Sequence, residues 1–309
     1  MRIVSQSVPQ VSRNRARVPF AKKPGKRGLR FRDLAELALQ EKQNHGIKES
    51  SLRADRLRLG VLDPLVGNLK IARLKSRTFS HALSDIASRR ELTPASFNRY
   101  HALVSSICAC GVREGLLDVN PMADGRVQRR HEMRIHVRYL ERHEQSQLLA
   151  ALKRDRPEKV DEVELAILTG MRRGEQFHAR WSDWKRKESV LYVTGKTGPR
   201  EVRINRAAGR CLARMRRRTR PEQVFITPER NVSPVDRRLW FERAVKRAAL
   251  ASKFRWHDLR HTFCSRLVAA GVPLLEVQQL AGHASYATTL RYAHLSPDHR
   301  RKAVEKVRF

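Results

Sequence analysis

Apolar residues recur at helical spacing along most of the chain, and this pattern constrains the fold more than any other feature. Phe31, Leu34, Ala35 and Ala38 follow the spacing i, i+3, i+4, i+7, which places them on one face of a helix. Related patterns continue through the first third of the chain, and no strand pattern interrupts them. We therefore predict a small helical bundle over residues 31–122.

Thr93 and Pro94 form the clearest helix start in this bundle. Threonine is a favoured N-cap residue, and proline is tolerated in the first helical turn. An apolar stripe that includes Phe97 and Val104 follows. Because glycine commonly ends a helix, we expect this helix to end near Gly111.

The second half of the chain keeps the helical spacing but also contains a hairpin pattern. Val190–Thr194 and Glu201–Asn205 are rich in β-formers and alternate, and Gly195–Pro199 joins them as a turn. The predicted fold class is mainly α with a small β-hairpin, an α+β arrangement, in the second domain. Helices are expected around the hairpin at 141–153, 160–168, 207–218, 233–250, 258–270 and 273–282, from 285 onward, and in the basic stretch 297–309.

The charge of the chain indicates a polyanionic partner. Lys and Arg total 65 against 31 Asp and Glu, which gives a formal net charge of +34. Such an excess destabilises a compact fold by self-repulsion unless a polyanion binds, and an arginine-rich chain indicates nucleic acid. A membrane surface is a poorer match, because the sequence has no long apolar run and no amphipathic anchor. A basic protein without such a partner remains the alternative.

Two basic segments flank the bundle. Residues 1–30 contain no acidic residue and few apolar ones, so we predict a flexible arm that either lies along DNA or is solvated. Residues 123–139 are predicted to link the two domains. The arginines of this linker are candidate phosphate contacts, with a solvated charge run as the alternative: Arg126, Arg129, Arg130, Arg134 and Arg138.

The four cysteines are scattered, which indicates neither a disulfide framework nor a zinc site. We therefore expect a reducing compartment. The first residues also lack the apolar core of a secretory signal. The expected location is the cytoplasm.

Arg172 and Arg260 stand in apolar surroundings, where an arginine is costly without an anionic partner. A guanidinium presents a planar fork that matches two phosphate oxygens. Two such groups could hold one phosphodiester and stabilise its pentacoordinate transition state. The alternative is a structural ion pair, for which Glu175, three residues after Arg172, is the evident partner. His257 precedes Arg260 by the same spacing and is expected to face the same way.

Three further residues are candidates for proton transfer or nucleophilic attack. His283 follows Gly282 at a predicted helix end, and Lys196 lies at the hairpin turn. Tyr292 carries a phenol with an ordinary pKa of ~10, which needs cationic neighbours or a base to react at pH 7. The alternatives are a capping histidine, a solvent-exposed lysine and a packing tyrosine.

Metal and nucleotide sites are not indicated. His257 and His261 have a zinc-like i, i+4 spacing, but Asp258 stands where that motif has glutamate, and no third ligand follows at motif spacing. The stretch Gly195–Thr197 lacks the upstream glycine of a phosphate-binding loop. We therefore expect no metal ion and no cofactor.

Taken together, four patches resemble the tyrosine recombinase (phage integrase) family. The resemblance covers residues 31–300 and implies a helical core-binding, SAM-like domain at 31–122 and a catalytic domain at 140–295, which together clamp duplex DNA. The patches are Thr169-Gly-Met-Arg172-Arg-Gly-Glu175, then Lys196 in the hairpin, then His257-Asp-Leu-Arg260-His261, and finally Gly282-His283 with the later Tyr292.

The resemblance implies a role for each of these residues. Tyr292 would attack the scissile phosphodiester and form a 3′-phosphotyrosyl bond, leaving a free 5′-hydroxyl. The remaining roles would be Arg172 and Arg260 on the non-bridging oxygens, Lys196 as the acid for the leaving 5′-oxygen, His257 in proton transfer at the nucleophile, His283 on the phosphate, and Glu175 as a support.

The implied function is site-specific recombination, as the integrase of a mobile element. The resemblance further implies double-stranded DNA and a synaptic tetramer of this chain as partners. It implies that residues 296–309 dock on a neighbouring subunit. Accessory DNA-bending or directionality factors are possible further partners. An Xer-like resolvase, a type IB topoisomerase-like relaxing enzyme and a DNA-binding factor without catalysis are the alternatives. Ala281 departs from the leucine common in the family, and the amino-terminal arm is short for a separate arm-site domain.

Overall fold

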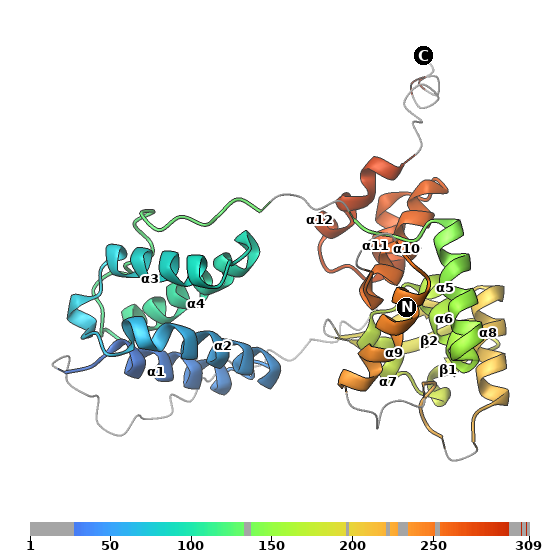
Figure 1. The fold of residues 1–309 in the computed structure, drawn as a ribbon, viewed down its shortest axis with the longest axis horizontal. Coiled ribbons are helices and arrows are strands. Elements are labelled where there is room, and N and C mark those ends of the chain that lie inside the picture. The colour runs from blue at the N-terminus through green and yellow to red at the C-terminus, as the bar shows by residue number, and fades with distance from the viewer. Residues whose placement is uncertain are drawn as a thin grey trace, which may run out of the picture. The chain divides into compact units, whose positions relative to one another are not determined.

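The computed structural model describes residues 28–132, 137–195, 198–220, 223–227, 234–250 and 254–296, together with 304 and 307. The chain divides into two compact units, Met1–Arg134 and Ile135–Phe309 (Figure 1). The predicted arm and the predicted helix at 297–309 lie outside the described residues, apart from a few positions. None of the helices in the described ranges is both long and apolar enough to span a lipid bilayer.

The first unit is helical, as the apolar spacing predicts. Helix α1 packs against α2 and α4, and α3 packs against α4. The buried face of α1 is the predicted one, and the rings of Phe31 and Phe79 lie 5.4 Å apart between their centroids. The elements of this unit are α1 (Phe31–Asn44), α2 (Glu49–Leu62), η1 (Asp63–Gly67), η2 (Ile71–Arg73), α3 (Ser76–Arg89) and α4 (Pro94–Arg113).

Helix α4 begins as predicted but ends later than predicted. The Thr93 hydroxyl accepts a hydrogen bond from the Ser96 amide, which confirms the N-cap. At the other end, the helix continues through Gly111 to Arg113. A Cβ on Gly111 would lie 3.0 Å from a Leu34 methyl carbon, so this glycine permits close packing of α4 on α1. The chain instead reverses at Gly115, whose φ of +69° is accessible to glycine.

The second unit combines helices with a small sheet, which confirms the predicted fold class. Its described helices are α5 (Arg142–Asp155), α6 (Val160–Thr169), α7 (Arg173–His178), α8 (Arg206–Arg217), α9 (Pro234–Arg247), α10 (Trp256–Ala269), α11 (Leu274–Ala281) and α12 (Tyr286–Thr289), with the short turns η3 (Pro157–Lys159), η4 (Trp181–Asp183) and η6 (Leu290–Leu295).

The sheet is antiparallel, with strand order β1 (Trp184–Lys185), β2 (Val190–Gly195) and β3 (Gly198–Arg203). The predicted second strand, at 201–205, was placed too late in the chain. Gly195 pairs with Gly198, so β3 starts immediately after the turn. Asn205 leaves the strand because its side chain accepts a hydrogen bond from the Ala208 amide and caps α8.

Helix α10 connects two parts of the core of this unit. Leu259 lies in the cluster that contains Phe177 and Phe241, whereas Cys264 and Val268 lie in a cluster with Tyr292. The helix packs against α6, α11 and η6. This central position brings one face of α10 beside segments that are distant in the sequence.

The last predicted helix of the described chain is broken. We expected one helix from Ser285 through Tyr292, but α12 ends at Thr289 and a 3-10 turn, η6, carries Tyr292. The two threonines at its end are β-branched and disfavour a longer helix. The break places Tyr292 in the core beside α10.

Candidate active site

Arg172 lies in the turn between α6 and α7 and caps α7. Its backbone is extended, with φ −65° and ψ 148°. Its amide donates to Glu175 Oε2 at 2.8 Å, and its Nη1 donates to Glu175 Oε1 at 2.7 Å. The predicted ion pair is therefore present, but as a capping interaction rather than as two residues on one helix face. The second guanidinium nitrogen donates to the Gly282 carbonyl at 2.6 Å.

Glu175 also binds Arg200, a residue of β3. Arg200 Nη2 lies 2.8 Å from Glu175 Oε2, and Arg200 Nε lies 3.2 Å from Oε1. Burial alone would raise the pKa of Glu175, but the hydrogen bonds from Arg200 and from the Arg172 amide outweigh it and lower that pKa to about 2. Arg200 Nη1 further donates to the Leu280 carbonyl at 3.1 Å. Arg200 thus ties the hairpin to α7 and to the end of α11.

Arg260 of α10 is 2% exposed, and only one of its two Nη atoms forms a hydrogen bond with the described residues. Its Nη1 donates to the Gly170 carbonyl at 2.7 Å, whereas its Nη2 is buried and has no hydrogen-bond partner among the described residues. Burial, together with the nearby charge of Arg172, lowers the pKa of Arg260 to about 10, so the group stays charged at pH 7. A buried charged donor without a partner is costly, and an anion would satisfy it.

Tyr292 is 1% exposed, and its hydroxyl contacts His261. The phenol oxygen lies 2.5 Å from His261 Nδ1. Burial and the neighbouring Cys264 thiol raise the pKa of Tyr292 above its ordinary value, so the phenol is neutral at pH 7. Its ring stacks on His283, with 6.3 Å between centroids and 3° between planes.

Two histidines, His261 and His283, contact the tyrosine, and a third, His257, contacts His261. The rings of His257 and His261 lie one helical turn apart on α10, with 4.9 Å between centroids. Burial lowers the pKa of His257, and the Arg260 charge lowers it further. Burial and then His257 lower the pKa of His261 to about 4. His283 Nδ1 lies 2.9 Å from Thr289 Oγ1, and burial followed by the Arg260 charge lowers the pKa of His283 to about 3.

The structure thus brings together residues from four separate segments of the second unit. Lys196 lies outside the described residues, although its neighbour Gly195 packs closely on Glu175, where a Cβ would lie 2.8 Å from Oε1. The predicted residues that the contacts link to one another are Arg172, Glu175, His257, Arg260, His283 and Tyr292.

The sequence interpretation missed two residues of this site. Arg200 carries no local signal, because its partner Glu175 lies in another element. His261 belongs to the recognised His257-to-His261 patch, but its spacing was considered only for a zinc ion. The sequence offers His257, His261 and His283 as possible partners of the Tyr292 hydroxyl, and only the packing of α10 against η6 selects His261.

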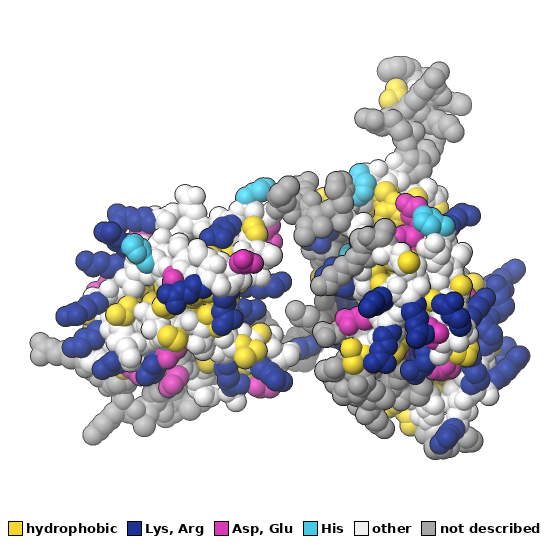
Figure 2. Space-filling model, viewed as in Figure 1, with side chains coloured by type: hydrophobic (Ala, Val, Ile, Leu, Met, Phe, Trp, Pro, Cys, Tyr) yellow, Lys and Arg dark blue, Asp and Glu magenta, His cyan; other side chains and the backbone are white. Residues whose placement is uncertain are grey.

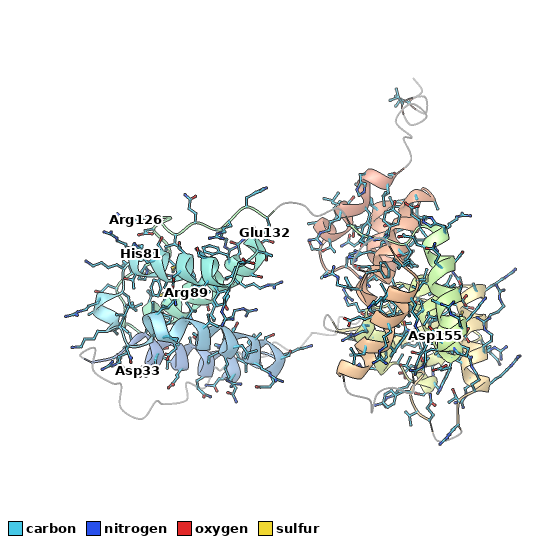
Figure 3. The ribbon with its side chains drawn as sticks, viewed as in Figure 1. Asp33, His81, Arg89, Arg126, Glu132 and Asp155 are labelled. Carbon is cyan, nitrogen blue, oxygen red and sulfur yellow. The ribbon has the colours of Figure 1, made fainter. Side chains whose placement is uncertain are left out.

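The linker arginines differ in their surroundings. Arg138 lies 2.9 Å from Glu144 and packs over the Phe254 ring, so its charge is already balanced. The Arg130 guanidinium lies 4.1 Å from the Phe97 ring centroid. Arg126 and Arg129 are exposed, and Figure 3 places Arg126 beside α3, the helix that carries His81 and Arg89. Arg134 lies outside the described residues.

One group of side chains has metal-ligand character. Ligand atoms of Asp161, Glu164 and Cys211 lie within 4.8 Å of one another. However, Arg214 forms ion pairs with both carboxylates, and Arg218 forms another with Asp161. The arginines therefore neutralise the acidic side chains, and the group is an ion-pair network between α6 and α8.

Sequence comparisons place the chain among known proteins. Residues 138–299 match the model of the phage integrase family. The integrase of Salmonella phage P22 is 33% identical over 182 residues, which are 53% of this chain and 45% of that protein. Tyrosine recombinase XerC of Proteus mirabilis is 30% identical over 229 residues, which are 70% of this chain and 73% of that protein. The aligned region thus spans less than half the length of the P22 integrase.

Two solved structures share the fold. A structure of the Tn1549 transposon integrase in complex with a circular intermediate DNA has a TM-score of 0.74 at 18% identity, covering 88% of this chain and 98% of that chain. A lambda integrase dimer bound to a core site has a TM-score of 0.70 at 18% identity, covering 84% and 97%. At this identity the likeness concerns the fold. The family model matches more than half of the sequence, and the alignment with XerC at 30% identity covers 73% of that protein. The chain therefore belongs to the phage integrase family of tyrosine recombinases.

Proposed function

We propose that this protein is a site-specific DNA recombinase that cuts and rejoins DNA through a 3′-phosphotyrosyl intermediate. One observation carries the proposal. The buried Tyr292 lies within the electrostatic influence of the charged Arg260, whose Nη2 lacks a hydrogen-bond partner within the described ranges. A phosphodiester is an anion whose oxygens accept hydrogen bonds in the planar geometry of a guanidinium.

The proposed reaction follows from this arrangement. Arg172 and Arg260 bind the non-bridging phosphate oxygens and stabilise the charge of the transition state. Tyr292 attacks the phosphorus, the bond to the 5′-oxygen breaks, and Lys196 protonates the leaving oxygen. His283 faces the phosphate, and Glu175 holds Arg172 in place. Proton transfer at the nucleophile falls to the two imidazoles of α10.

The charge of the surface supports DNA as the substrate. Lys and Arg side chains lie on the visible face of both units and outnumber the acidic side chains there (Figure 2). Helix α8 alone contributes several basic residues, including Arg210 and Arg217. The related transposon and lambda integrases have been solved in complex with DNA, the latter also as a tetramer on a Holliday junction. We infer that this chain acts on duplex DNA as a tetramer.

The domain assignment is part of the proposal. The hydrophobic cluster of the first unit contains residues from Phe31 to Val127, whereas the other clusters contain residues from Leu140 to Tyr292. We assign 31–122 to DNA core binding, 123–139 to the linker, whose first residues pack on the first unit through Val127, and 140–295 to catalysis. Residues 1–30 remain the proposed arm, and 296–309 the proposed docking segment.

Covalent trapping tests this function. The protein is incubated with sheared DNA from the genome that carries its gene, the mixture is denatured, and protein-linked fragments are sequenced to identify the site. A duplex with that site, nicked beside the cleavage position, then traps the intermediate because the short 5′-hydroxyl fragment diffuses away. We expect a denaturant-resistant complex that forms without a divalent metal.

Two variants make the trapping experiment decisive. Tyr292→Phe should form no complex but should bind the duplex normally, and Arg172→Ala should lose the complex while most of the affinity remains. A complex that forms equally with Tyr292→Phe would disprove the proposal.

Resolution of DNA by an Xer-like enzyme is a second candidate. It is favoured by the alignment with XerC, which covers 73% of that protein, more than the 45% covered in the P22 integrase. The sequence of the trapped fragments distinguishes the two candidates. Fragments from the ends of a mobile element support integration or excision, whereas a single site elsewhere in the chromosome supports resolution.

A further inference from the structure

The Tyr292 hydroxyl contacts His261, a residue that has not yet been given a role of its own. The phenol oxygen and His261 Nδ1 are 2.5 Å apart, and the two rings lie 5.8 Å apart between centroids. His257 is one turn earlier on α10, and its ring is in contact with the His261 ring. Within the described residues, the imidazole that contacts the reacting oxygen is therefore that of His261.

We propose that His261 is the catalytic proton acceptor for Tyr292, so that His257 acts behind it rather than on the nucleophile. This inference rests on the proposed recombinase function. In the step, the Tyr292 oxygen forms a bond to phosphorus while its proton passes to His261 Nδ1. The bond from phosphorus to the 5′-oxygen breaks, and that oxygen takes a proton from Lys196. The active site thus gains one proton at His261 and loses one at Lys196.

The surroundings of His261 suit an acceptor. Burial lowers the pKa of His261 to about 4, so the imidazole is neutral at pH 7. In the tautomer that carries its proton on Nε2, the lone pair lies on Nδ1 and the neutral phenol donates to it. The low pKa makes the free imidazole a weak base, and the negative charge of a bound phosphate would raise that pKa. After the transfer, the imidazolium would be close to the phosphate, which carries negative charge. The titratable and charged groups that face His261 come from α10, from the turn before it and from the segment 283–292: His257, Arg260, Arg255, Arg291, His283 and Tyr292.

The alternative is that the hydrogen bond only holds the Tyr292 side chain in an unreactive, buried position before DNA binds; we call this a storage contact. Tyr292 is 1% exposed, so a pure storage contact would have to break before attack. The two roles predict opposite effects of removing the imidazole. Loss of an acceptor slows cleavage, whereas loss of a storage contact leaves cleavage unchanged or accelerates it.

The pH dependence of cleavage in His261→Asn tests the proposal. Asparagine places an amide oxygen where Nδ1 lies, so it keeps the hydrogen bond but cannot take up the proton. The substrate is the nicked duplex with sulfur in place of the leaving 5′-oxygen. A thiolate leaves without protonation, so the rate no longer depends on Lys196, and any remaining pH dependence reports the deprotonation of Tyr292. Single-turnover rates are measured with the full-length protein between about pH 6 and pH 9.

We expect a pH-independent rate for the wild-type protein over this range. His261→Asn should be slower by about 100-fold at pH 7, the typical contribution of a general base. Its rate should rise about tenfold per pH unit, because attack then requires the phenolate, which becomes more abundant as pH rises. His257→Asn should be slower but should keep the flat profile. His143→Asn, an exposed histidine on α5, should match the wild type.

Other outcomes would overturn the inference. A flat profile for His261→Asn, or cleavage at least as fast as that of the wild type, would show that His261 is not the acceptor. The same holds if His257→Asn acquires the steep profile instead. If His261→Asn does not fold by circular dichroism, His261→Gln is measured in the same way. Failure of the recombinase proposal is distinguishable, because the wild type itself would then form no Tyr292-dependent complex.

Discussion

At the scale of single residues, Glu175 organises the site. Its carboxylate is 1% exposed and accepts hydrogen bonds from both Arg172 and Arg200. Two guanidiniums around one carboxylate leave a net positive charge. That excess charge, added to that of Arg260, suits a site that binds an anion. Arg200 therefore has a positioning role, since its contacts are with Glu175 and backbone carbonyls.

Replacing Arg200 should lower the free energy of unfolding and slow DNA cleavage. Arg200→Ala removes one of the two guanidinium partners of a buried carboxylate, and the loss of hydrogen bonds to a charged group typically costs about 1.5–3 kcal/mol. Arg200→Lys keeps the charge but cannot reproduce the fork and should recover only part of the loss. Urea unfolding measures the free energy of unfolding of the wild type and of each variant. Arg203→Ala on the same strand is the matched control, because its pair with Glu201 is exposed and should contribute less than about 1 kcal/mol. Equal effects of the two alanine variants would contradict this role.

The pH dependence of stability should reveal the Glu175 cluster. The folded-state pKa of Glu175 is lowered to about 2, below its ordinary value of ~4.3. The carboxylate therefore contributes stability that is fully present above about pH 5 and is lost as the pH falls toward 2. The difference in unfolding free energy between wild type and Glu175→Gln should shrink over this interval. A difference that does not change between pH 6 and pH 3 would argue against the lowered pKa.

At the scale of elements, the end of α11 is held by the site itself. Gly282 ends the helix with φ +66° and ψ 48°. Its carbonyl accepts from Arg172, and the Leu280 carbonyl accepts from Arg200. Both arginines thus bind carbonyls that a helix end leaves without intrahelical partners. The same turn places the His283 ring on the Tyr292 ring, so the residues that end α11 also belong to the candidate site.

Gly282→Ala should therefore be strongly destabilising. An alanine at this φ is strained by roughly 1–2 kcal/mol, and its Cβ would lie 2.6 Å from Arg200 Cδ. We expect a lower melting temperature and slower covalent trapping. Gly209→Ala within α8 is the control, because its Cβ would meet only Ile204 Cγ2 at 3.9 Å. The control should stabilise the protein by about 0.5–1 kcal/mol. A neutral Gly282→Ala would mean that the turn tolerates a side chain.

At the scale of the whole molecule, the net charge of +34 should dominate DNA affinity. Each phosphate contact releases counterions, so affinity should fall by on the order of 10³ or more between 50 and 200 mM salt. Fluorescence anisotropy with a duplex measures this slope. Arg129→Ala should reduce the slope by about 1, whereas Arg138→Ala should not, because Glu144 already binds that guanidinium. A flat salt response would contradict the charge argument.

The two units should also fold separately. The apolar clusters of the described residues stay within one unit or the other, so each unit has its own core. Fragments 1–134 and 135–309 are each expected to show a helical circular dichroism spectrum and a cooperative thermal transition. A fragment that unfolds without cooperativity would show that its stability depends on the other unit.

The sequence by itself determined most of the elements and named the residues of the candidate site. Helical spacing, the Thr93 N-cap and the glycine after α11 act within a few residues, so most of the longer helices could be predicted with small errors at their ends. The short helix α7 was not predicted, and the helix from Ser285 was wrongly expected to continue through Tyr292. The motif residues from Arg172 to Tyr292 were recognisable because their order and types are specific. Local rules erred where packing decides, as at Gly111, which continues a helix because it lies against Leu34.

Only the tertiary structure decided which side chains meet. Arg200 joins Glu175 from a different strand, and His261, rather than His257, contacts the Tyr292 hydroxyl. Neither contact follows from spacing, because each joins residues at least 25 positions apart. The relevant distances are set by how α10 packs against η6 and how the hairpin packs against α7. Burial then lowers the pKa of His261 to about 4 and holds the pKa of Tyr292 above its ordinary value, and burial is a property of the assembled core.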